Sequence, residues 1–517
     1  MNPRRRVAVY NKYWHSRGGG ERYTGMVAQV LSRTDVDVEL IAHESTDLGE
    51  LGAYLGLDLN ACSLRVIPDV GEGALAQLME DYDLLVNGSY MSRLPARPAK
   101  AMYLCYFPTP ADHDLPEWQR RAARAFGRIA TSPSEFSLTG WGVGWFPAAT
   151  LRLRTVMWTN GRGRLQLPPG KSVDLLFDVA RLSGPPTKLD VTVDGTVIGT
   201  FGVEPRFEKA RVTVPESSET RELVFESDWF APEKPDQRRL GVAISRLRFG
   251  TDGRHPSAWL GARFPWLLRD PRGLSFLDGY QVIVAISSYT AEWIQTLWNR
   301  STEIMYPPIH VESFEPAPER DRSIVTVGRF FPPGAGHSKR QVEQVQTFGA
   351  MVREGQLTGW TLHVIGGCEP AQESYLDAVR SEAAGLPVEI HPNAPRDTLA
   401  RLMNRAAIHW SATGYGQDES RSPWASEHFG ITTAEAMAAG CVPIVIDKAG
   451  QREIVRDGVD GYRWTTLAEL RDLTLRVAND EALRAQLASS ARARSLQYSD
   501  DAFAEHLLEI VERNQLL

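Results

Sequence analysis

The sequence predicts an α/β protein made of two doubly wound halves that face each other across a cleft, with an all-β sandwich inserted in the first half. Short apolar runs alternate with helical patterns in the first 130 residues, as in a parallel sheet buried on both faces. Period-two alternation with turn signals then replaces this pattern for about 110 residues, and the α/β pattern resumes afterwards.

Composition and charge narrow the class of protein. The chain has 517 residues, enough for two or three domains, and a formal net charge of −7, which argues against general nucleic-acid binding. Four scattered cysteines without Cys/His clustering exclude a zinc site of standard spacing and indicate reduced thiols in a cytosolic setting. We expect two of them, Cys105 and Cys441, in the core. No apolar run reaches the length of a membrane span, and MNPRRRVAVYN has no separate apolar segment, so we expect no secretory signal.

The first half, residues 1–133, reads as alternating strands and helices, and residues 251–314 complete it and lead into a linker. We expect helices over Glu21–Ser32 and Ala74–Asp81. The expected strands are Val7–Tyr10, Val38–Ala42, Leu64–Ile67, Leu84–Val86 and Ala101–Tyr106.

The inserted sandwich is expected over residues 134–250. Its clearest signal is a hairpin over Leu189–Phe201 with Asp194-Gly195 at the tip, the residue pair that a type I′ turn favours. Such a module could bind carbohydrate, with Trp158 and Trp229 as sugar platforms. It could equally serve packing or oligomerisation, with both tryptophans in its core.

The second half is expected over residues 315–499, with helices at Arg340–Glu354, Thr398–Arg405 and Thr432–Ala439. Its strands are SIVTVGRF, TLHVIGG, VEIHPN, IHWSAT and VPIVID. The last segment, residues 500–517, reads as an amphipathic helix with no strand after it.

One segment of the second half, Ser426–Asp447, carries the strongest functional signal. It places Glu427 and Glu435 on either side of a glycine-led turn that runs into a helix. A helix start offers unpaired N–H groups and partial positive charge, which suit a phosphate. One carboxylate on each side suits a ligand with hydroxyls at both ends of a diphosphate, as in a nucleotide sugar. Acids near a helix start are also common for dipole reasons alone, so the pair of glutamates is not sufficient by itself.

Two further segments could serve the same ligand. Gly18, Gly19 and Gly20 follow the first strand and precede a helix, where glycine lets backbone N–H groups approach a ligand. Arg329 follows a strand in VGRFFPPGAGHSKRQ, and we expect Lys339 to open the next helix, with Arg340 as its neighbour and rival. Two cations at this edge can hold a diphosphate and stabilise its departure.

Together these motifs resemble those of family 4 retaining glycosyltransferases, which have the GT-B fold. The string EHFGITTAEAMAAGCVPI resembles the family's donor motif, and GRF followed by a loop and Lys resembles its phosphate-binding pair. GGGER resembles the glycine loop of mannosyltransferases that extend the dolichol-linked oligosaccharide. ISSYTAEWI resembles the family's segment with a Ser-x-x-Thr cap. The resemblance covers all but the β insertion, and in this family the last helix packs back across the cleft.

The resemblance implies roles position by position. Arg329, Lys339 and Glu427 would be the catalytic residues, the first two stabilising the diphosphate and the third binding sugar hydroxyls. Glu435 would bind the ribose. The implied donor-binding residues are Gly18, Gly19, Gly20, Gly328, His428, Phe429, Gly430, Ile431, Thr432 and Glu435. No bound metal or other cofactor is implied.

The acceptor side departs from the family pattern. Relatives carry a histidine in the segment matching LCYFPTPADHD, where this chain has Tyr106, and His113 follows nearby. Either could serve the acceptor, and His113 could also be an ordinary loop histidine.

The function implied is retaining transfer of a hexose from a nucleotide diphosphate sugar to a hydroxyl of a glycan or lipid-linked acceptor in bacterial cell-envelope polysaccharide synthesis. GDP-mannose is the first expectation for the donor and a UDP sugar the second. A nucleotide-sugar epimerase of the same fold and a non-catalytic sugar-binding protein remain alternatives.

The expected location is cytoplasmic, with peripheral contact at the inner face of the membrane as an open question. Glu117–Arg128 and Trp259–Gly273 mix Arg with Trp, Phe and Leu. Such segments can seat on an anionic membrane surface, or they can be ordinary helices with one solvated face.

Overall fold

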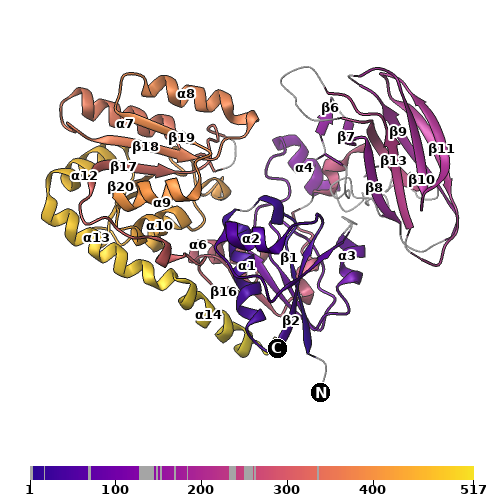
Figure 1. The fold of residues 1–517 in the computed structure, drawn as a ribbon, viewed down its shortest axis with the longest axis horizontal. Coiled ribbons are helices and arrows are strands. Elements are labelled where there is room, and N and C mark those ends of the chain that lie inside the picture. The colour runs from indigo at the N-terminus through magenta and orange to yellow at the C-terminus, as the bar shows by residue number, and fades with distance from the viewer. Residues whose placement is uncertain are drawn as a thin grey trace.

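The computed structural model places two parallel sheets and two antiparallel sheets in one chain (Figure 1). It describes residues 4–16, 18–67, 72–126, 145–146, 149–151, 154–167, 171–182, 184–219, 221–231, 240–249, 260, 263–269, 271–334 and 337–517. The predicted boundaries near residues 134 and 250, and much of Trp259–Gly273, lie outside these residues.

The N-terminal half is built on a seven-stranded sheet in which every pair is parallel, in the order β16-β15-β5-β4-β1-β2-β3. Its strands are β1 (Arg5–Tyr10), β2 (Val36–Ala42), β3 (Ser63–Val66), β4 (Leu84–Asn87), β5 (Lys100–Cys105), β15 (Val282–Ala285) and β16 (Glu303–Ile304). Its helices are α1 (Gly19–Ser32), α2 (Leu48–Leu55), α3 (Glu72–Leu78), α4 (Glu117–Phe126) and α6 (Ser288–Trp298). The expected strands and helices of this half are all present.

Strand β15 pairs in parallel with β5, although about 180 residues separate them in the sequence (Figure 1). The antiparallel strands fall between these two neighbours. They form a four-stranded sheet, β11-β10-β13-β8, and a five-stranded sheet, β12-β9-β14-β7-β6. Their bounds are β6 (Ala149–Leu151), β7 (Arg154–Trp158), β8 (Arg162–Leu167), β9 (Val173–Ala180), β10 (Thr187–Val193), β11 (Thr196–Val203), β12 (Glu208–Val214), β13 (Arg221–Ser227) and β14 (Ala243–Phe249).

The hairpin of β10 and β11 turns at Asp194 and Gly195, which have φ values of 48° and 80°. Positive φ at both positions is what a type I′ turn requires, so the predicted hairpin is confirmed. Trp158 is buried beside Leu240, so it is a core residue and not a sugar platform. Trp229 is 50% exposed and stays a candidate for that role.

The C-terminal half holds a six-stranded parallel sheet in the order β19-β18-β17-β20-β21-β22. Its strands are β17 (Asp321–Val327), β18 (Thr361–Gly366), β19 (Val388–Pro392), β20 (Ala406–Ser411), β21 (Val442–Ile446) and β22 (Tyr462–Trp464). Its helices are α7 (Gln341–Arg353), α8 (Glu373–Ala383), α9 (Arg396–Arg405), α10 (Ile431–Ala438), α11 (Gln451–Ile454), α12 (Leu467–Asn479) and α13 (Glu481–Ser495).

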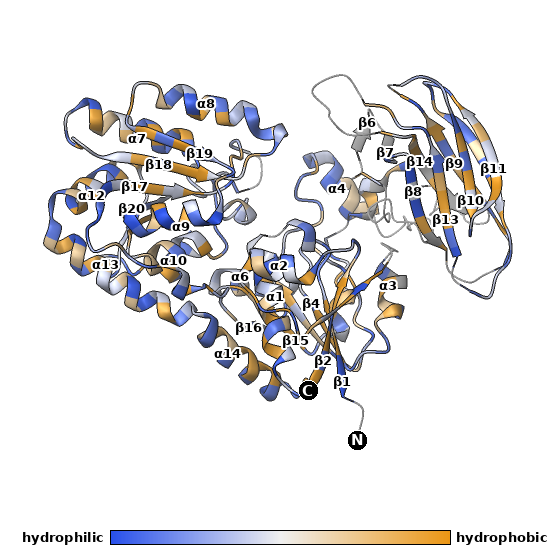
Figure 2. Cartoon of the chain, viewed as in Figure 1, coloured by the Kyte–Doolittle hydropathy of each residue, from blue (hydrophilic) through white to orange (hydrophobic). Residues whose placement is uncertain are grey.

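In this half, apolar residues lie in the sheet layer and polar residues lie on the outer side of the helix layers (Figure 2). Strands β20 and β21 are buried along their whole length, which is why they read as continuous apolar runs. Figure 2 shows apolar residues gathered on the central strands and polar residues on the outward side of the helices that cover them. Cys105 and Cys441 are buried, as predicted.

Helix α14 (Asp500–Arg513) leaves the C-terminal half and packs on α1 of the N-terminal half, as the yellow helix along the lower edge of Figure 1 shows. Its buried residues Phe503, Leu507 and Ile510 join one apolar cluster with Tyr23 and Met26 of α1. The predicted return of the last helix across the two halves is therefore present.

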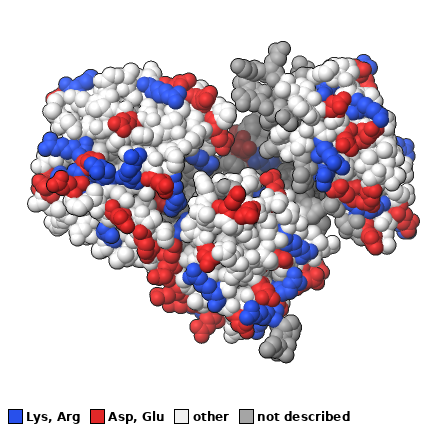
Figure 3. All heavy atoms as spheres, viewed as in Figure 1, with Lys and Arg blue, Asp and Glu red and all other residues white. Residues whose placement is uncertain are grey.

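Two surface properties bear on binding partners. Lys and Arg are interspersed with Asp and Glu over the face in Figure 3. Among the described residues, no helix combines the length and the apolar character needed to cross a membrane.

Candidate functional site: the donor-binding end of the C-terminal sheet

The predicted donor segment forms the start of α10. Gly430 precedes the helix with φ 117°, and a Cβ there would lie 2.8 Å from Gln451 Nε2. Both facts require glycine, because other residues rarely adopt this φ and none would fit. The first N–H groups of α10, including those of Ile431 and Thr432, precede the first intrahelical acceptor bond, which Thr433 N makes to the Gly430 carbonyl.

Glu427 and Lys339 form an ion pair in front of this helix start. Lys339 Nζ donates to Glu427 Oε2 at 2.5 Å, and Thr413 Oγ1 donates to the same oxygen at 3.2 Å. Burial opposes ionisation of Glu427, but Lys339, His337 and the hydrogen bonds together hold its pKa below the usual value. The carboxylate is therefore charged at neutral pH. Its ion pair with Lys339 joins two residues that lie 88 positions apart in the sequence.

Lys339 reaches this position by running across Gly328. A Cβ on Gly328 would lie 2.4 Å from Lys339 Cγ, so any larger residue would displace the lysine stem. Gln341 holds the same loop, because its amide donates to the carbonyls of Gly328 and Arg329 at 3.1 and 3.2 Å. The close approach of the Lys339 side chain to Gly328 therefore explains why the GRF motif begins with glycine.

Arg329 is exposed, and its guanidinium lies 4.7 Å from the centroid of the Phe331 ring. Within the described part of the chain, its side chain makes no ion pair and no hydrogen bond. A cation that lacks a protein anion can receive one from a ligand.

The helix after this loop begins later than predicted, because α7 starts at Gln341 and Lys339 lies before it. Arg340 occupies the preceding position with φ 56°, and its guanidinium donates to Glu343 at 2.9 Å. Arg340 is thus paired within its own helix, whereas Lys339 faces Glu427. The geometry favours Lys339 over its neighbour as the site cation.

Glu435 lies within α10 with its side chain largely buried. Burial raises its pKa, although Arg396, 3.8 Å away, and Arg22 partly oppose this. No hydrogen bond to its carboxyl is present among the described residues. A buried carboxyl without a hydrogen-bond partner is available to a ligand hydroxyl.

The predicted glycine loop meets the donor segment directly, but α1 begins earlier than predicted, so Gly19 and Gly20 are its first two residues and only Gly18 precedes it. Gly18 precedes α1, and its N–H donates to Glu21 Oε2 at 2.7 Å. A Cβ on Gly19 would lie 2.8 Å from Cδ1 of Ile431 at the start of α10. The two predicted segments, over four hundred positions apart, are therefore in contact.

The Tyr106 hydroxyl makes polar contacts with Gly20 of this segment and with two of its neighbours. Its hydroxyl lies 2.8 Å from Gly20 O, 3.0 Å from Gly88 O and 2.7 Å from Thr24 Oγ1. Burial raises the pKa of this hydroxyl well above its usual value. With three protein partners, Tyr106 positions the glycine loop, and it has no remaining group directed at an acceptor.

His428 and Phe429 lie where the two halves meet. The His428 ring stacks on Phe107 at 4.1 Å, and its carbonyl accepts from Ser287 Oγ at 2.5 Å. Phe429 is buried against Tyr306, so its side chain belongs to the core. Either residue can contribute backbone to a ligand, but the Phe429 ring does not line the site.

Ser287 also confirms the predicted helix cap, because its hydroxyl accepts from Thr290 N at 3.0 Å at the start of α6. His113 lies 5.9 Å, centroid to centroid, from Trp424 of the other half. Of the two acceptor-side candidates, His113 is the one whose ring faces across the boundary.

Two histidines of this region were not among the predicted site residues. His337 is half-buried, with Nδ1 3.1 Å from the Ser426 carbonyl, and its ring packs edge-on against His428. Burial lowers its pKa, so it is neutral near pH 7. His409 lies beneath the site on β20, and burial lowers its pKa to about 4. Neither position stands in a recognisable motif.

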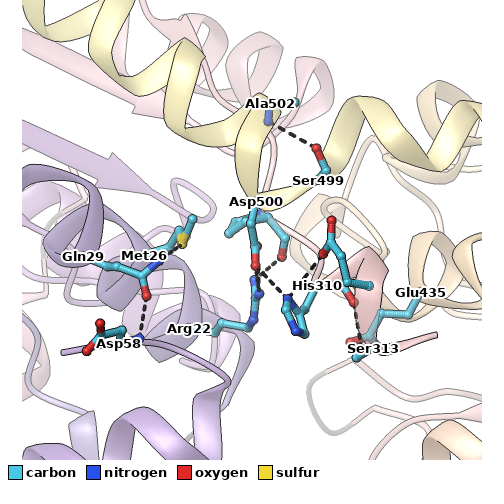
Figure 4. Close-up of polar contacts among 12 residues, drawn as sticks. Arg22, Met26, Gln29, Asp58, His310, Ser313, Glu435, Ser499, Asp500 and Ala502 are labelled. Carbon is cyan, nitrogen blue, oxygen red and sulfur yellow. Dashed lines mark hydrogen bonds and ion pairs between the residues drawn. The ribbon is translucent and has the colours of Figure 1, made fainter. Parts of the chain in front are cut away.

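A polar contact between the halves was also not predicted. Figure 4 shows Arg22 of α1 and His310 of the linker pointing toward Asp500 at the start of α14. Clusters of three potential metal ligands exist among the described residues at His310, Glu312 and Asp500 and at His363, Glu389 and His391. Neither includes Glu427 or Glu435.

Comparison with known proteins agrees with this geometry. Residues 312–494 match the family model described as "Glycosyl transferases group 1", so this segment is a glycosyltransferase domain. It holds every donor-site residue named above except those of the glycine loop.

Two curated relatives show sequence similarity. The "GDP-Man:Man(3)GlcNAc(2)-PP-Dol alpha-1,2-mannosyltransferase" of Xenopus laevis is 28% identical over 254 residues, covering 44% of this chain and 47% of the relative. The "N,N'-diacetylbacillosaminyl-diphospho-undecaprenol alpha-1,3-N-acetylgalactosaminyltransferase" of Campylobacter jejuni is 31% identical over 94 residues, covering 18% of this chain and 25% of the relative. The chain thus spans about half the length of the first relative.

Structural similarity extends over nearly the whole chain. The crystal structure of Anabaena HepE in complex with UDP and glucose superposes with a TM-score of 0.53 at 10% identity, covering 98% of this chain and 100% of HepE. The fold is GT-B.

Proposed function

We propose that this protein is a retaining glycosyltransferase that moves a hexose from a nucleotide diphosphate sugar to a hydroxyl of a glycan or glycolipid. One observation carries the proposal: the Lys339–Glu427 pair stands directly before the start of α10, and Arg329, which follows the end of β17, has no anionic partner among the described residues. The helix N–H groups and two cations suit a diphosphate, and the two glutamates suit the hydroxyls on either side of it.

The transfer step needs no protein nucleophile. The acceptor oxygen bonds to the anomeric carbon as the bond to the leaving phosphate oxygen breaks on the same face. The acceptor proton passes to that phosphate oxygen, so charge and atoms balance. Glu427 stays paired with Lys339 and Thr413, which favours a role in binding over covalent attack. Arg329 and Lys339 stabilise the charge on the departing diphosphate.

We propose that this step requires no divalent ion, because the two cations and the α10 start supply positive charge where a metal would otherwise stand. Activity that survives EDTA supports this. Activity that is lost in EDTA and returns with manganese overturns it.

Donor and acceptor follow from the relatives' names. The Xenopus laevis relative is named for GDP-mannose, so mannose from GDP-mannose is our first choice and UDP sugars the second. Both relatives are named for acceptors linked by a diphosphate to a lipid, so a polyprenyl-diphosphate glycan is the acceptor we propose.

We place the enzyme in the cytoplasm, in peripheral contact with the inner face of the membrane. Helix α4 carries Trp118, 62% exposed, together with Arg120, Arg121 and Arg124. Aromatic and basic side chains in this combination bind anionic lipid surfaces. Cosedimentation with anionic vesicles that does not change in the triple variant R120E/R121E/R124E would remove this contact.

The test of function has two stages. A thermal-shift screen with GDP-mannose, UDP sugars and the free nucleotides identifies the donor. Incubation with that donor and a polyprenyl-diphosphate glycan, followed by NMR of the product, should show a new bond with the donor's anomeric configuration. Release of an epimerised sugar without transfer would indicate an epimerase. Donor binding with neither transfer nor hydrolysis would indicate a sugar-binding protein.

A further inference from the structure

Two strands at the edge of the C-terminal sheet bring together three metal-ligating side chains that the proposed transfer does not use. His363 lies on β18, and Glu389 and His391 lie on the neighbouring edge strand β19. His363 pairs in register with Glu389, and His391 is two residues further along the strand, so all three side chains share one face.

The three potential ligand atoms form a nearly regular triangle. His363 Nδ1 lies 3.3 Å from His391 Nε2 and 3.3 Å from Glu389 Oε2, and His391 Nε2 lies 3.5 Å from that oxygen. Bonds of about 2.0–2.1 Å to a tetrahedral ion separate neighbouring ligand atoms by about 3.3–3.4 Å. The triangle therefore has the size of one face of a tetrahedral coordination shell.

A hydrogen-bonded cluster explains this arrangement less well. The carboxylate oxygen can accept from both imidazoles, but the two N–H groups would then approach each other at 3.3 Å with their protons on the same side.

Exposure leaves room for an ion to enter and for a fourth ligand from solvent. His363 is largely buried, whereas the His391 and Glu389 side chains are 24% and 59% exposed. Two imidazoles and one carboxylate form a ligand set that suits a first-row divalent ion, zinc above all.

The second cluster of potential ligands, His310, Glu312 and Asp500, is less suited to a metal ion. Asp500 of that cluster already accepts two hydrogen bonds from the Arg22 guanidinium, each at 2.8 Å. A permanent cation thus occupies the place that a metal ion would take.

We propose that His363, Glu389 and His391 bind one zinc-class divalent ion, separate from the transfer site. The candidate donor-site residues of the C-terminal half follow the ends of β17 and β20 or lie in or just before α10, whereas these ligands lie within β18 and β19. The ion would tie the edge strand β19 to β18 and would take no part in the transfer.

The test uses the full chain, freed of metal by a chelator and titrated with Co²⁺. The expected result is one Co²⁺ per chain, with visible absorption bands of tetrahedral intensity that Zn²⁺ abolishes by displacement, and a higher melting temperature in Zn²⁺. His391→Ala should weaken Co²⁺ binding by at least about 100-fold, since even second-shell changes cost about 10- to 100-fold. Glu389→Ala, at the most exposed of the three positions, should weaken it too and keeps the test valid if His391→Ala fails to fold.

Two variants serve as controls. Glu382→Ala removes an exposed carboxylate of α8, and His310→Ala removes the histidine of the other cluster. Both should bind Co²⁺ as the unmodified chain does. The proposal is overturned if no Co²⁺ binds, if His391→Ala and Glu389→Ala leave the affinity unchanged, if His310→Ala abolishes binding, or if a thiolate charge-transfer band places the ion on a cysteine.

Discussion

Arg22 and Asp500 join the two ends of the chain across the boundary between its halves. Both oxygens of Asp500, at the start of α14, accept from Arg22 Nη2 at 2.8 Å, while Arg22 Nη1 donates to the Pro308 carbonyl at 2.6 Å (Figure 4). The Arg22 side chain is only 8% exposed. Because Arg22 lies in the first turn of α1, which begins with Gly19 and Gly20, this pair links the glycine segment to the returning helix α14.

Breaking this pair should loosen α14. Asp500→Asn leaves the buried Arg22 cation without its counter-charge, which we expect to cost about 2 kcal/mol and so to speed local opening about 30-fold. Hydrogen–deuterium exchange of the α14 amides measures this directly. Asp501→Asn, at the exposed neighbouring position, is the matched control and should leave exchange unchanged. Equal exchange in both variants would show that the pair does not hold the helix.

The Lys339–Glu427 pair should control turnover. Lys339→Met removes the cation beside the leaving diphosphate, and we expect turnover to fall by about 10²–10³. Glu427→Gln should lower it to a similar degree. Arg340→Met is the control, since Arg340 pairs with Glu343. Steady-state transfer rates measure this effect, and circular dichroism checks that the variants fold. Near-native rates in both site variants would show that these residues have no part in the mechanism.

The contact between the glycine loop and α10 makes a steric prediction. Gly19→Ala places a methyl group 2.8 Å from Ile431 Cδ1, and we expect a loss of about 1 kcal/mol, or about fivefold in kcat/KM. Gly20→Ala, whose new Cβ meets Tyr106 at an ordinary 3.4 Å, should behave as the unmodified chain. The double variant G19A/I431A should recover activity if the clash is the cause. A defect that persists there would place the effect elsewhere in the loop.

His409 should make stability depend on pH. Its folded-state pKa of about 4 lies below the usual 6.5, so between these values the unfolded chain binds a proton that the folded chain does not. The free energy of unfolding should therefore decrease as pH falls from 6.5 toward 4, by up to about 3 kcal/mol from this group. Urea titrations at a series of pH values measure the slope. His409→Gln should flatten it, and an unchanged slope would assign the loss to other groups such as His337 and His428.

Local patterns predicted much of the fold and of the donor side. The apolar runs of β20 and β21 are buried on both faces, and Asp194-Gly195 forms its turn because both residues accept positive φ. Gly430, Glu427 and Glu435 lie within nine residues of one another, so their arrangement follows from a turn and a helix start. Lys339 was predicted as a site cation, but the helix start was placed too early because Arg340 adopts a left-handed conformation.

Contacts between distant segments could not be predicted in the same way. Tyr106 was predicted as an acceptor-side residue, yet its hydroxyl is taken up by Gly20, Gly88 and Thr24. Phe429 stands within the donor motif, yet its ring packs on Tyr306. Which way such a side chain points depends on the neighbours that tertiary packing supplies.

Residue patterns along the chain were enough to predict the two α/β halves, the antiparallel strands between them and a set of candidate donor-site residues in the C-terminal half, because each depends on hydrophobic periodicity or on a short run of turn and helix chemistry. Three other relationships come from tertiary packing: Gly19 touches Ile431, Arg22 binds Asp500 across 478 positions, and His363 and His391 face one carboxylate. These relationships depend on how sheets and helices pack, and packing joins residues whose separation along the chain carries no local signal.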